Sequence, residues 1–363
     1  MNEVKMQVIT KTLPAYTVQS EGDGIFDAWI KADSKVAVLG GHTALSLTRE
    51  VLKQYLMTQD LAVFWTGGEC NQSNHDRLIA ECSVLACDWI IGVGGGRALD
   101  MAKWVAETLR KPILCIPTIA STCAACSAVS VVYDDKHQFV RIHELQNAPR
   151  HIILIPSILA EAPVHFLHAG IGDAISKPVE INFSGKHQAW SYPNFLGKSI
   201  AEATLSILLE QGEAAYQANQ NRCVNASFIN VVSAIIMGVG YASILVDEDY
   251  NSALAHALYN AFMNLDSVKR YAHGLVVAYG VLVQCLVDED QTGFERLYPF
   301  YKRLSLPISL CDIGTTIDDP ELVGVVEAAL MMPDCQYVSK QLTLDIVLEA
   351  MRSLETIKSQ EVI

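Results

Sequence analysis

The sequence has little positive charge. It contains 26 Lys and Arg residues against 40 Asp and Glu, a formal net charge of −14. Affinity for nucleic-acid phosphates comes from clustered basic side chains, so no nucleic-acid partner is expected. The acidic runs at residues 247–249 and 288–290 are expected to be solvated surface.

Long uninterrupted apolar runs are also missing. The most apolar stretch, residues 228–246, contains Asn230, Ser233 and Gly238 and has no basic residue directly at either end. This pattern predicts a buried core helix rather than a membrane span, and no membrane partner. Residues 1–5 show no basic segment followed by an apolar one, so no secretory signal is expected.

Cysteine is plentiful, with ten residues, but the chain lacks a second pair with zinc-finger spacing. Cys123 and Cys126 form a lone CxxC without the context of a redox motif, so neither a structural zinc nor a redox pair is expected there. Several other cysteines lie in apolar runs, which predicts reduced, buried thiols and a cytoplasmic protein. These are Cys82, Cys87, Cys115, Cys223 and Cys285.

The length of 363 residues predicts about two domains, and no internal repeat or low-complexity linker divides the chain. The first part alternates short apolar runs with helical patterns. Strands that are apolar on both faces predict a parallel sheet covered by helices. The expected strands are residues 36–39, 61–65, 89–93, 113–117 and 152–155, with helices to about residue 56, over 74–86 and over 94–110, and a hairpin over 130–141.

From about residue 160 the strand pattern disappears and helical periodicity replaces it. The expected helices are residues 201–216, 223–240, 251–263, 273–287 and 343–354. The predicted architecture is an α/β N-terminal domain with a parallel sheet, residues 1–160, followed by an all-α C-terminal domain, residues 161–363.

Residues 90–100 are expected to form a buried strand, a tight glycine turn and the start of a helix. Apolar residues lead into Gly94, Gly95 and Gly96, and an amphipathic segment follows. Glycine allows the backbone to approach a ligand, and the free amides of a helix start favour an anion such as a pyrophosphate. The spacing is GxGGG rather than GxGxxG, so the Rossmann fingerprint is not met, and plain tight packing is the alternative.

Three residues of the helical part are candidates for chemistry. Asp173 follows a Gly-x-Gly at an expected helix start, His256 lies on an otherwise apolar helix face, and His273 leads a hydrophobic helix. Singly, each has an ordinary explanation as an N-cap or a hydrogen-bonded core histidine. Together, one carboxylate and two imidazoles suit a catalytic divalent metal with an open fourth position. His165 and His168 are alternative histidines.

Six motifs in order carry a family resemblance. They are residues 92–103, 117–122, 127–133, 169–173, 255–257 and 273–280. The chain thereby resembles the glycerol dehydrogenase-like branch of the metal-dependent (iron- or zinc-containing) alcohol dehydrogenases over nearly its whole length. The resemblance implies the dehydroquinate synthase-like, iron-containing alcohol dehydrogenase fold and a homo-oligomer.

The resemblance also implies the site residues. The metal ligands would be Asp173, His256 and His273, and Lys177 stands where iron-dependent relatives carry a further histidine, which points to zinc. Lys103 and Tyr279 are expected to serve packing or the surface. The nicotinamide cofactor would bind at Gly94, Gly95, Gly96, Arg97, Asp100, Thr118, Ser121, Ser127, Val129 and Tyr133.

Two departures from the glycerol dehydrogenase pattern bear on substrate and cofactor. Cys123 replaces an aspartate that faces the polyol, and losing that charge favours a carboxylate-bearing substrate. A subgroup with the same Thr-Cys-Ala-Ala run is associated with reduction of 2-oxo acids; an uncharged aldehyde is the alternative. The end of the first strand, residues 39–43, has no acidic residue to repel a 2′-phosphate, which favours NADP(H), although no Arg or Lys stands beside it.

Two further departures lie beside the expected metal. Pro178 stands where relatives have tryptophan and is expected to bend or confine its helix, and Leu275 and Val276 replace a polar pair.

The expected function is therefore hydride transfer between NAD(P)H and a small carbonyl or alcohol substrate, a 2-oxo acid and 2-hydroxy acid pair. The first alternative is a glycerol (polyol) dehydrogenase. A dehydroquinate synthase-like lyase and a dehydrogenase of phosphorylated polyols are disfavoured by the shortage of basic residues near the motifs, and the lyase also by Asp173 in place of glutamate. A metal-free nucleotide-binding pseudoenzyme is the remaining alternative.

Overall fold

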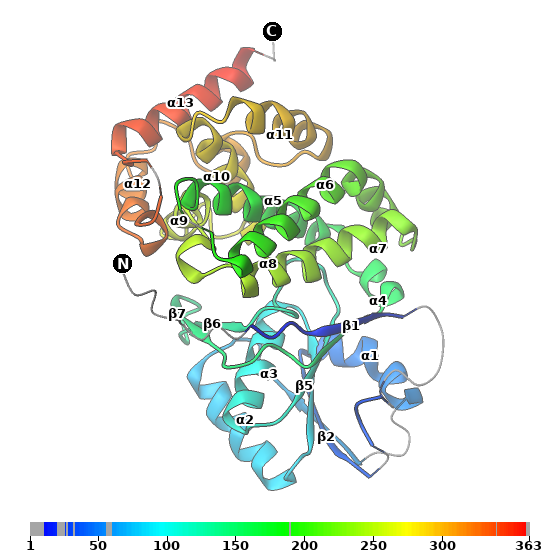
Figure 1. The fold of residues 1–363 in the computed structure, drawn as a ribbon. Coiled ribbons are helices and arrows are strands. Elements are labelled where there is room, and N and C mark those ends of the chain that lie inside the picture. The colour runs from blue at the N-terminus through cyan, green and yellow to red at the C-terminus, as the bar shows by residue number, and fades with distance from the viewer. Residues whose placement is uncertain are drawn as a thin grey trace, which may run out of the picture.

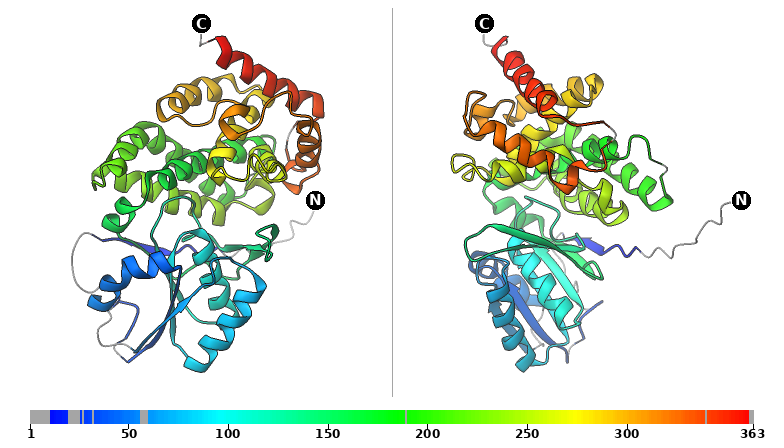
Figure 2. Two further views of the ribbon diagram at one scale, coloured as in Figure 1. Left: turned by 180° about the vertical axis from the view of Figure 1, so that it is seen from behind. Right: turned by 90° about the vertical axis from the view of Figure 1, so that its left-hand side faces the viewer.

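The computed structural model describes residues 11–19, 26, 28–31, 33–55, 60–188, 190–338 and 340–360. Strands occupy the first part of the chain and end at Leu154, and the elements from Pro156 onward are helical. The helical part lies across one end of the α/β part (Figures 1 and 2). The predicted class, a parallel α/β part followed by a helical one, is thus observed. The division into two domains at residue 160 stays a prediction.

The central sheet has six strands in the order β1-β8-β5-β4-β2-β3. Their pairings are all parallel. The strand β1 was not predicted, whereas the other five match the expected runs within one residue. The bounds are β1 Ala15–Val18, β2 Lys35–Gly40, β3 Asp60–Trp65, β4 Trp89–Gly94, β5 Ile113–Pro117 and β8 His151–Leu154.

The inner strands are buried because alternate residues enter two separate cores. In β2, Ala37 and Leu39 belong to one apolar cluster, whereas Val36 and Val38 belong to the other. Helices α2 (Gln72–Leu85) and α3 (Gly96–Thr108) cover the first face, and α1 (His42–Tyr55) covers the second (Figure 1). The two-residue period of a strand explains why these runs are apolar throughout. Residue 56, the expected end of α1, lies outside the described residues.

The predicted hairpin is also present. Strands β6 (Val129–Tyr133) and β7 (Phe139–Glu144) pair antiparallel as a separate two-stranded sheet. The hydroxyl of Ser130 donates a 2.8 Å hydrogen bond to the carbonyl of Asp100, which attaches the hairpin to α3.

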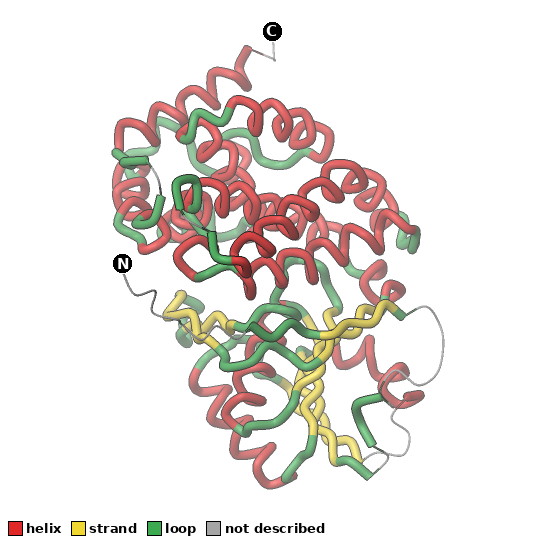
Figure 3. Tube along the Cα trace, in the orientation of Figure 1, coloured by secondary structure: helices red, strands yellow, loops and turns green. Residues whose placement is uncertain are grey.

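The rest of the chain is helical (Figure 3). The elements are α4 Pro156–Glu161, α5 Val164–Ser184, α6 Tyr192–Gln220, α7 Ala226–Ser233, a π-helix η1 Ala234–Gly238, α8 Val239–Leu245, η2 Glu248–Tyr250, α9 Leu254–Phe262, α10 His273–Val287, α11 Gln291–Leu304, η3 Leu310–Ile313, α12 Leu322–Leu330, η4 Pro333–Cys335 and α13 Leu344–Gln360. Among these, α4, α5, α11 and α12 were not predicted from periodicity.

The most apolar helical segment is a core helix. The continuous segment Ala226–Leu245 is long and apolar enough to span a membrane by length and composition, and 67% of its most apolar window is buried against the rest of the chain. It packs against helix α6. The burial agrees with the predicted core helix.

The expectation that Asp173 begins a helix is wrong. Asp173 lies in the middle of α5, and Pro178 lies inside the same helix, which continues to Ser184 at the cost of one backbone hydrogen bond. Gly170 and Gly172 resemble helix breakers, but they serve close packing. A Cβ at Gly170 would collide with the carbonyl of Ala120, and one at Gly172 would collide with that of Gly274.

All ten cysteines are free, and most are buried as predicted. The exception among the five named above is Cys223, which is exposed because it lies in the turn between α6 and α7. Burial raises the pKa of Cys115 and of Cys285 to about 12.

This contrast predicts the pattern of thiol alkylation. At pH 8, iodoacetamide should modify the exposed Cys223 and Cys311 and leave Cys115 and Cys285 intact, because the thiolate is the reactive form and burial suppresses it. Peptide mapping by mass spectrometry measures the modified sites. Modification of Cys115 as fast as Cys223 in the native protein would contradict the packing, and denaturant should make all ten react.

Candidate metal centre and nucleotide-binding turn

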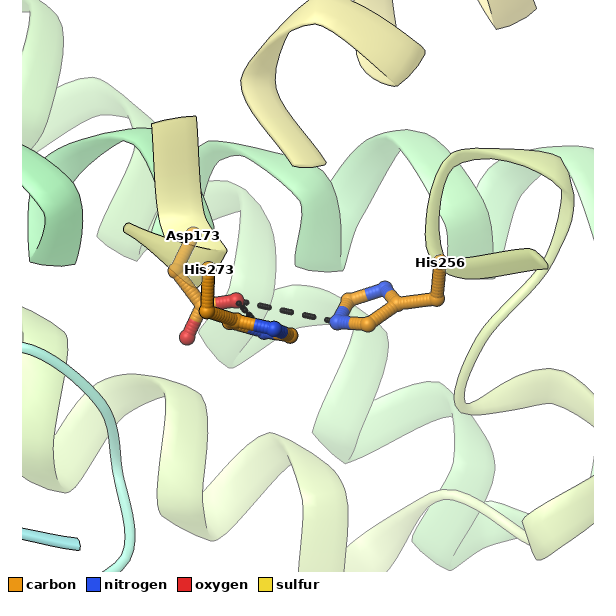
Figure 4. A group of neighbouring side chains, drawn as sticks. All are labelled: Asp173, His256 and His273. Carbon is orange, nitrogen blue, oxygen red and sulfur yellow. Dashed lines mark hydrogen bonds and ion pairs between the residues drawn. The ribbon is translucent and has the colours of Figure 1, made fainter. Parts of the chain in front are cut away.

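Three helices bring the three predicted ligands together. Asp173 lies on α5, His256 on α9 and His273 at the first position of α10. Their side chains point at one another (Figure 4). Asp173 is only 9% exposed, and the two imidazoles are partly buried.

The distances suit a single cation. The Nε2 atom of His273 lies 3.1 Å from Oδ1 of Asp173, and Nε2 of His256 lies 3.6 Å from the same oxygen. The three potential ligand atoms all lie within 4.8 Å of one another. Ligands of a tetrahedral zinc, each about 2.0–2.2 Å from the ion, lie about 3.4 Å apart, so this donor set fits a divalent metal. Among the described residues, it is the one such group.

Close helix packing produces this arrangement. Gly274 follows His273, and a Cβ there would collide with the carbonyl of Ala169 and approach Cβ of Asp173 to 2.9 Å. The missing side chain lets the start of α10 lie directly against α5. His273 therefore reaches Asp173 although the two are 100 residues apart in the chain.

The charges in the site are strongly coupled. Burial alone would raise the pKa of Asp173, but His273 and His256 hold it well below its usual range. Burial would lower the pKa of His256, whereas the carboxylates of Glu180 and Asp173 raise it to about 10. The site thus favours positive charge between its carboxylates, which a metal ion or a proton supplies.

Sequence reasoning missed Glu180. Its carboxylate is completely buried, and Oε2 lies 2.6 Å from Nδ1 of His256. Its Oε1 accepts backbone hydrogen bonds from Ala253 at 2.9 Å and His256 at 3.0 Å. The available signal was its spacing from Asp173, since residues i and i+7 share one helix face.

Lys177, one helical turn after Asp173, is buried and directed at another element. Its Nζ donates to the carbonyl of Asn251 at 2.5 Å and lies 3.4 Å from Oδ1 of the same residue. The ammonium therefore holds the segment before α9.

The glycine turn lies where the sheet meets α3. Gly94 ends β4 with a φ of +143°, Gly95 is the N-cap of α3 without a side-chain cap, and Gly96 is its first residue. The backbone N–H of Thr118 donates to the carbonyl of Gly94 at 3.1 Å. The turn and the loop after β5 are thus adjacent at the carboxyl ends of two parallel strands, where ligands of such sheets bind.

The buried side chain of Lys103 contacts three of the expected cofactor residues, which are Asp100, Ser127 and Val129. Its ammonium lies 3.0 Å from Oδ1 of Asp100 and donates to Oγ and the carbonyl of Ser127 at 3.1 and 3.2 Å and to the carbonyl of Val129. Lys103 is 1% exposed, so a surface role is wrong: the ammonium joins α3 to the segment entering β6. Tyr279 is fully buried and packs near Phe262, as the packing expectation required.

Arg97 directly follows the glycine turn and contacts Tyr133 and Glu69. The Arg97 guanidinium stands 5.8 Å from the centre of the Tyr133 ring, and its Nε lies 3.3 Å from the buried carboxylate of Glu69. Glu69 was not singled out from the sequence.

The loop after β5 connects the turn with the metal centre. Gly170 of α5 lies against Ala120 and Ser121 of this loop. Cys123 lies in the same loop, two residues after Ser121. Burial and the negative charge of Asp173 raise the pKa of its thiol to about 11, so the thiol is neutral at physiological pH.

Comparison with known sequences defines the family. The pattern described as iron-containing alcohol dehydrogenase matches residues 26–156. The chain is 34% identical over 295 residues to "Hydroxycarboxylate dehydrogenase A" of Escherichia coli K12, covering 80% of this chain and 81% of the relative. It is 34% identical over 274 residues to "Glycerol dehydrogenase" of Thermotoga maritima, covering 72% of each. The chain belongs to the iron-containing alcohol dehydrogenase family and is an oxidoreductase of the glycerol dehydrogenase-like type.

Solved structures agree with the fold. A probable glycerol dehydrogenase from Sinorhizobium meliloti 1021 superposes with a TM-score of 0.82 at 26% identity, covering 97% of this chain and 100% of the other. Glycerol dehydrogenase from Schizosaccharomyces pombe gives a TM-score of 0.85 at 27% identity, covering 98% and 92%. The family fold implied by the sequence motifs is confirmed.

The contact at Gly274 generates a prediction about the metal centre. Gly274→Ala should lower the free energy of unfolding by about 1–3 kcal/mol and weaken metal binding, because the added methyl forces α10 away from α5. The control is Gly324→Ala in α12, where a Cβ meets nothing within 4 Å. It should change stability by less than about 1 kcal/mol, in the stabilising direction. Chemical denaturation and zinc titration measure both effects; equal behaviour of the two variants would refute the packing argument.

Proposed function

We propose that the protein is a metal- and NAD(P)-dependent dehydrogenase that interconverts small 2-oxo acids and 2-hydroxy acids. The observation that carries the proposal is the convergence of Asp173, His256 and His273 on one point, with ligand atoms within 4.8 Å of one another. Family membership and the glycine turn at the end of β4 support it. The reaction joins a hydride from the nicotinamide to the carbonyl carbon and a proton from solvent to its oxygen, leaving oxidised cofactor and alcohol.

In this proposal the three side chains hold a divalent metal, with zinc favoured because Lys177 is not a fourth ligand. The bound metal supplies Lewis-acid polarisation of the substrate carbonyl. The imidazoles of His256 and His273 present nitrogens toward that position, and the Asp173 carboxylate offsets the positive charge. Partial burial of these side chains lowers the local screening by water, which strengthens these interactions.

The cofactor is proposed to lie along the carboxyl ends of β4 and β5. The free amides at Gly95, Gly96 and Arg97 at the start of α3 would face the pyrophosphate. The nicotinamide end is assigned to the loop after β5, which contacts α5 beside Asp173. The remaining proposed contacts are Gly94, Asp100, Thr118, Ser121, Ser127, Val129 and Tyr133.

The proposal also includes a division into domains, a compartment and an oligomeric state. Residues 1–160 form the proposed nucleotide-binding domain and residues 161–363 the metal-binding domain. We also propose a cytoplasmic homo-oligomer that acts on small molecules.

The substrate class rests on Cys123. Its neutral thiol places no negative charge at this point of the loop after β5, so a substrate carboxylate meets no repulsion from this side chain. The E. coli relative named hydroxycarboxylate dehydrogenase A supports this choice. Glycerol oxidation is the second candidate, supported by the relatives named glycerol dehydrogenase.

The function is tested on the zinc-loaded chain with a panel of 2-oxo acids, dihydroxyacetone and simple aldehydes under NADH or NADPH, and glycerol under NAD or NADP. We expect 2-oxo acids to give the highest kcat/KM. His256→Ala should abolish turnover while circular dichroism stays unchanged. Full activity of that variant would refute the metal centre, and faster turnover of glycerol than of any 2-oxo acid would refute the substrate class.

Cys123→Asp tests the role of the thiol. A carboxylate at this position should lower kcat/KM for 2-oxo acids by about tenfold, the effect of roughly 1.4 kcal/mol of repulsion, and spare uncharged carbonyl substrates. Cys123→Ser is the control, because it stays neutral. Equal losses on charged and uncharged substrates would show that charge at this position does not select the substrate.

The proposed preference for NADP(H) is tested at Gly41. This residue follows β2 beside the stacked rings of His42 and Trp65, and a Cβ there would meet nothing within 4 Å. Gly41→Asp should therefore fold normally and lower kcat/KM for NADPH about tenfold by repelling the 2′-phosphate. Gly41→Asn controls for size. An unchanged ratio of NADPH to NADH activity would contradict the preference.

A further inference from the structure

We propose that Glu180 is the positioning residue of the metal centre: its carboxylate keeps the hydrogen of His256 on Nδ1, so that Nε2 presents a free lone pair toward Asp173 and His273. The inference rests on the proposed function, because it assigns a role toward the metal that those three residues would hold.

The first support is the fixed orientation of the carboxylate. Glu180 lies on α5 and is 0% exposed, and its Oε1 accepts the backbone N–H groups of Ala253 and His256 at 2.9 and 3.0 Å. The N-cap residue of α9, Ala253, has no side-chain cap of its own. Glu180 therefore supplies the missing cap from another helix, and these two bonds determine which oxygen remains free.

The second support is the chemistry of that remaining oxygen. Oε2 lies 2.6 Å from Nδ1 of His256. An ionised carboxylate is only an acceptor, so Nδ1 must be the donor. A neutral imidazole carries one N–H, and its other nitrogen is then unprotonated and able to bind a metal.

The third support is the direction of the ring. With Nδ1 held by Glu180, Nε2 points at Asp173, 3.6 Å from its Oδ1 (Figure 4). Carboxylates that orient metal-binding histidines in this way change metal affinity by about 10- to 100-fold when they are removed. Glu180 has no contact with the metal position itself in this scheme, so its effect passes through His256.

A buried carboxylate must also be compensated. Glu180 is surrounded by three N–H donors, two from the α9 backbone and one from His256. An uncompensated buried charge would be strongly destabilising, and this complete set of donors allows the anion to remain in the core. The same bonds connect α5 and α9, the helices that carry Asp173 and His256.

Glu180→Gln separates the positioning role from the capping role. The amide is nearly isosteric, and its oxygen can still accept both backbone N–H groups. Its NH2 group then faces Nδ1 and requires an acceptor there, which moves the ring hydrogen to Nε2 and blocks the ligand atom. A residue that only capped α9 would leave metal affinity unchanged in this variant.

The matched control is Glu107→Gln. Glu107 also accepts from a histidine, His143, at 2.7 Å and from a backbone N–H, that of Gln146, at 2.7 Å. It lies on α3 and has no contact with the three ligands. The substitution thus repeats the same chemical change without a metal centre.

The experiment titrates the metal-free full-length chain with Zn²⁺ against a chromophoric chelator. We expect Glu180→Gln to raise the zinc Kd by about 10- to 100-fold and Glu107→Gln to leave it within about twofold. Circular dichroism checks that each variant is folded. A Glu180→Gln variant that is folded and binds zinc as tightly as the wild type would overturn the proposal.

A second measurement covers the case of a variant that fails to fold. In the zinc-loaded wild type labelled with ¹⁵N-histidine, His256 should show a hydrogen-bonded Nδ1–H signal, assigned by its loss in His256→Asn. Absence of that signal would overturn the proposal without any Glu180 variant. If the wild type itself binds no stoichiometric zinc, or binds it unchanged after Asp173→Ala, the proposed function fails instead, so the two failures are distinguishable.

Discussion

The contact between α5 and α10 is the constraint on which the candidate centre depends. Two helices approach this closely only where side chains are missing, and Gly172 and Gly274 face each other at that point. The approach places His273 at the start of α10 beside Asp173 in the middle of α5. A larger residue at either glycine would move Asp173 and His273 apart even if both side chains were retained.

The same helix α5 organises the other two parts of the site. Through Gly170 it lies against the loop after β5, which brings the carboxyl end of this strand, the proposed nucleotide site, next to Asp173. Through Glu180 it caps α9 and holds His256. Helix α5 therefore contacts the loop after β5, His256 and the start of α10, and most of its residues, Asp173 and Glu180 included, are buried.

Buried charge in this protein is compensated locally rather than avoided. Lys103 forms an ion pair with Asp100 and donates to three oxygens of the segment entering β6. Lys177 donates to Asn251, and Glu180 accepts from three N–H groups. Each pairing joins two segments that are distant in sequence. Polar groups in the core are costly when unpaired, so such pairs specify one arrangement of the helices and strands.

The sequence by itself determined five of the six strands of the sheet, the hairpin, the glycine turn and several helices, because local periodicity and motif order carry that information, and it singled out the three candidate ligands. It misplaced Asp173 at a helix start, since Gly170 and Gly172 resemble breakers until their neighbours are known. It also left Glu180 unnoticed and assigned Lys103 to packing or surface. Only the tertiary structure decided these points, because whether a glycine ends a helix or admits another backbone, and whether a charge is solvated or paired, depends on contacts between residues far apart in the chain.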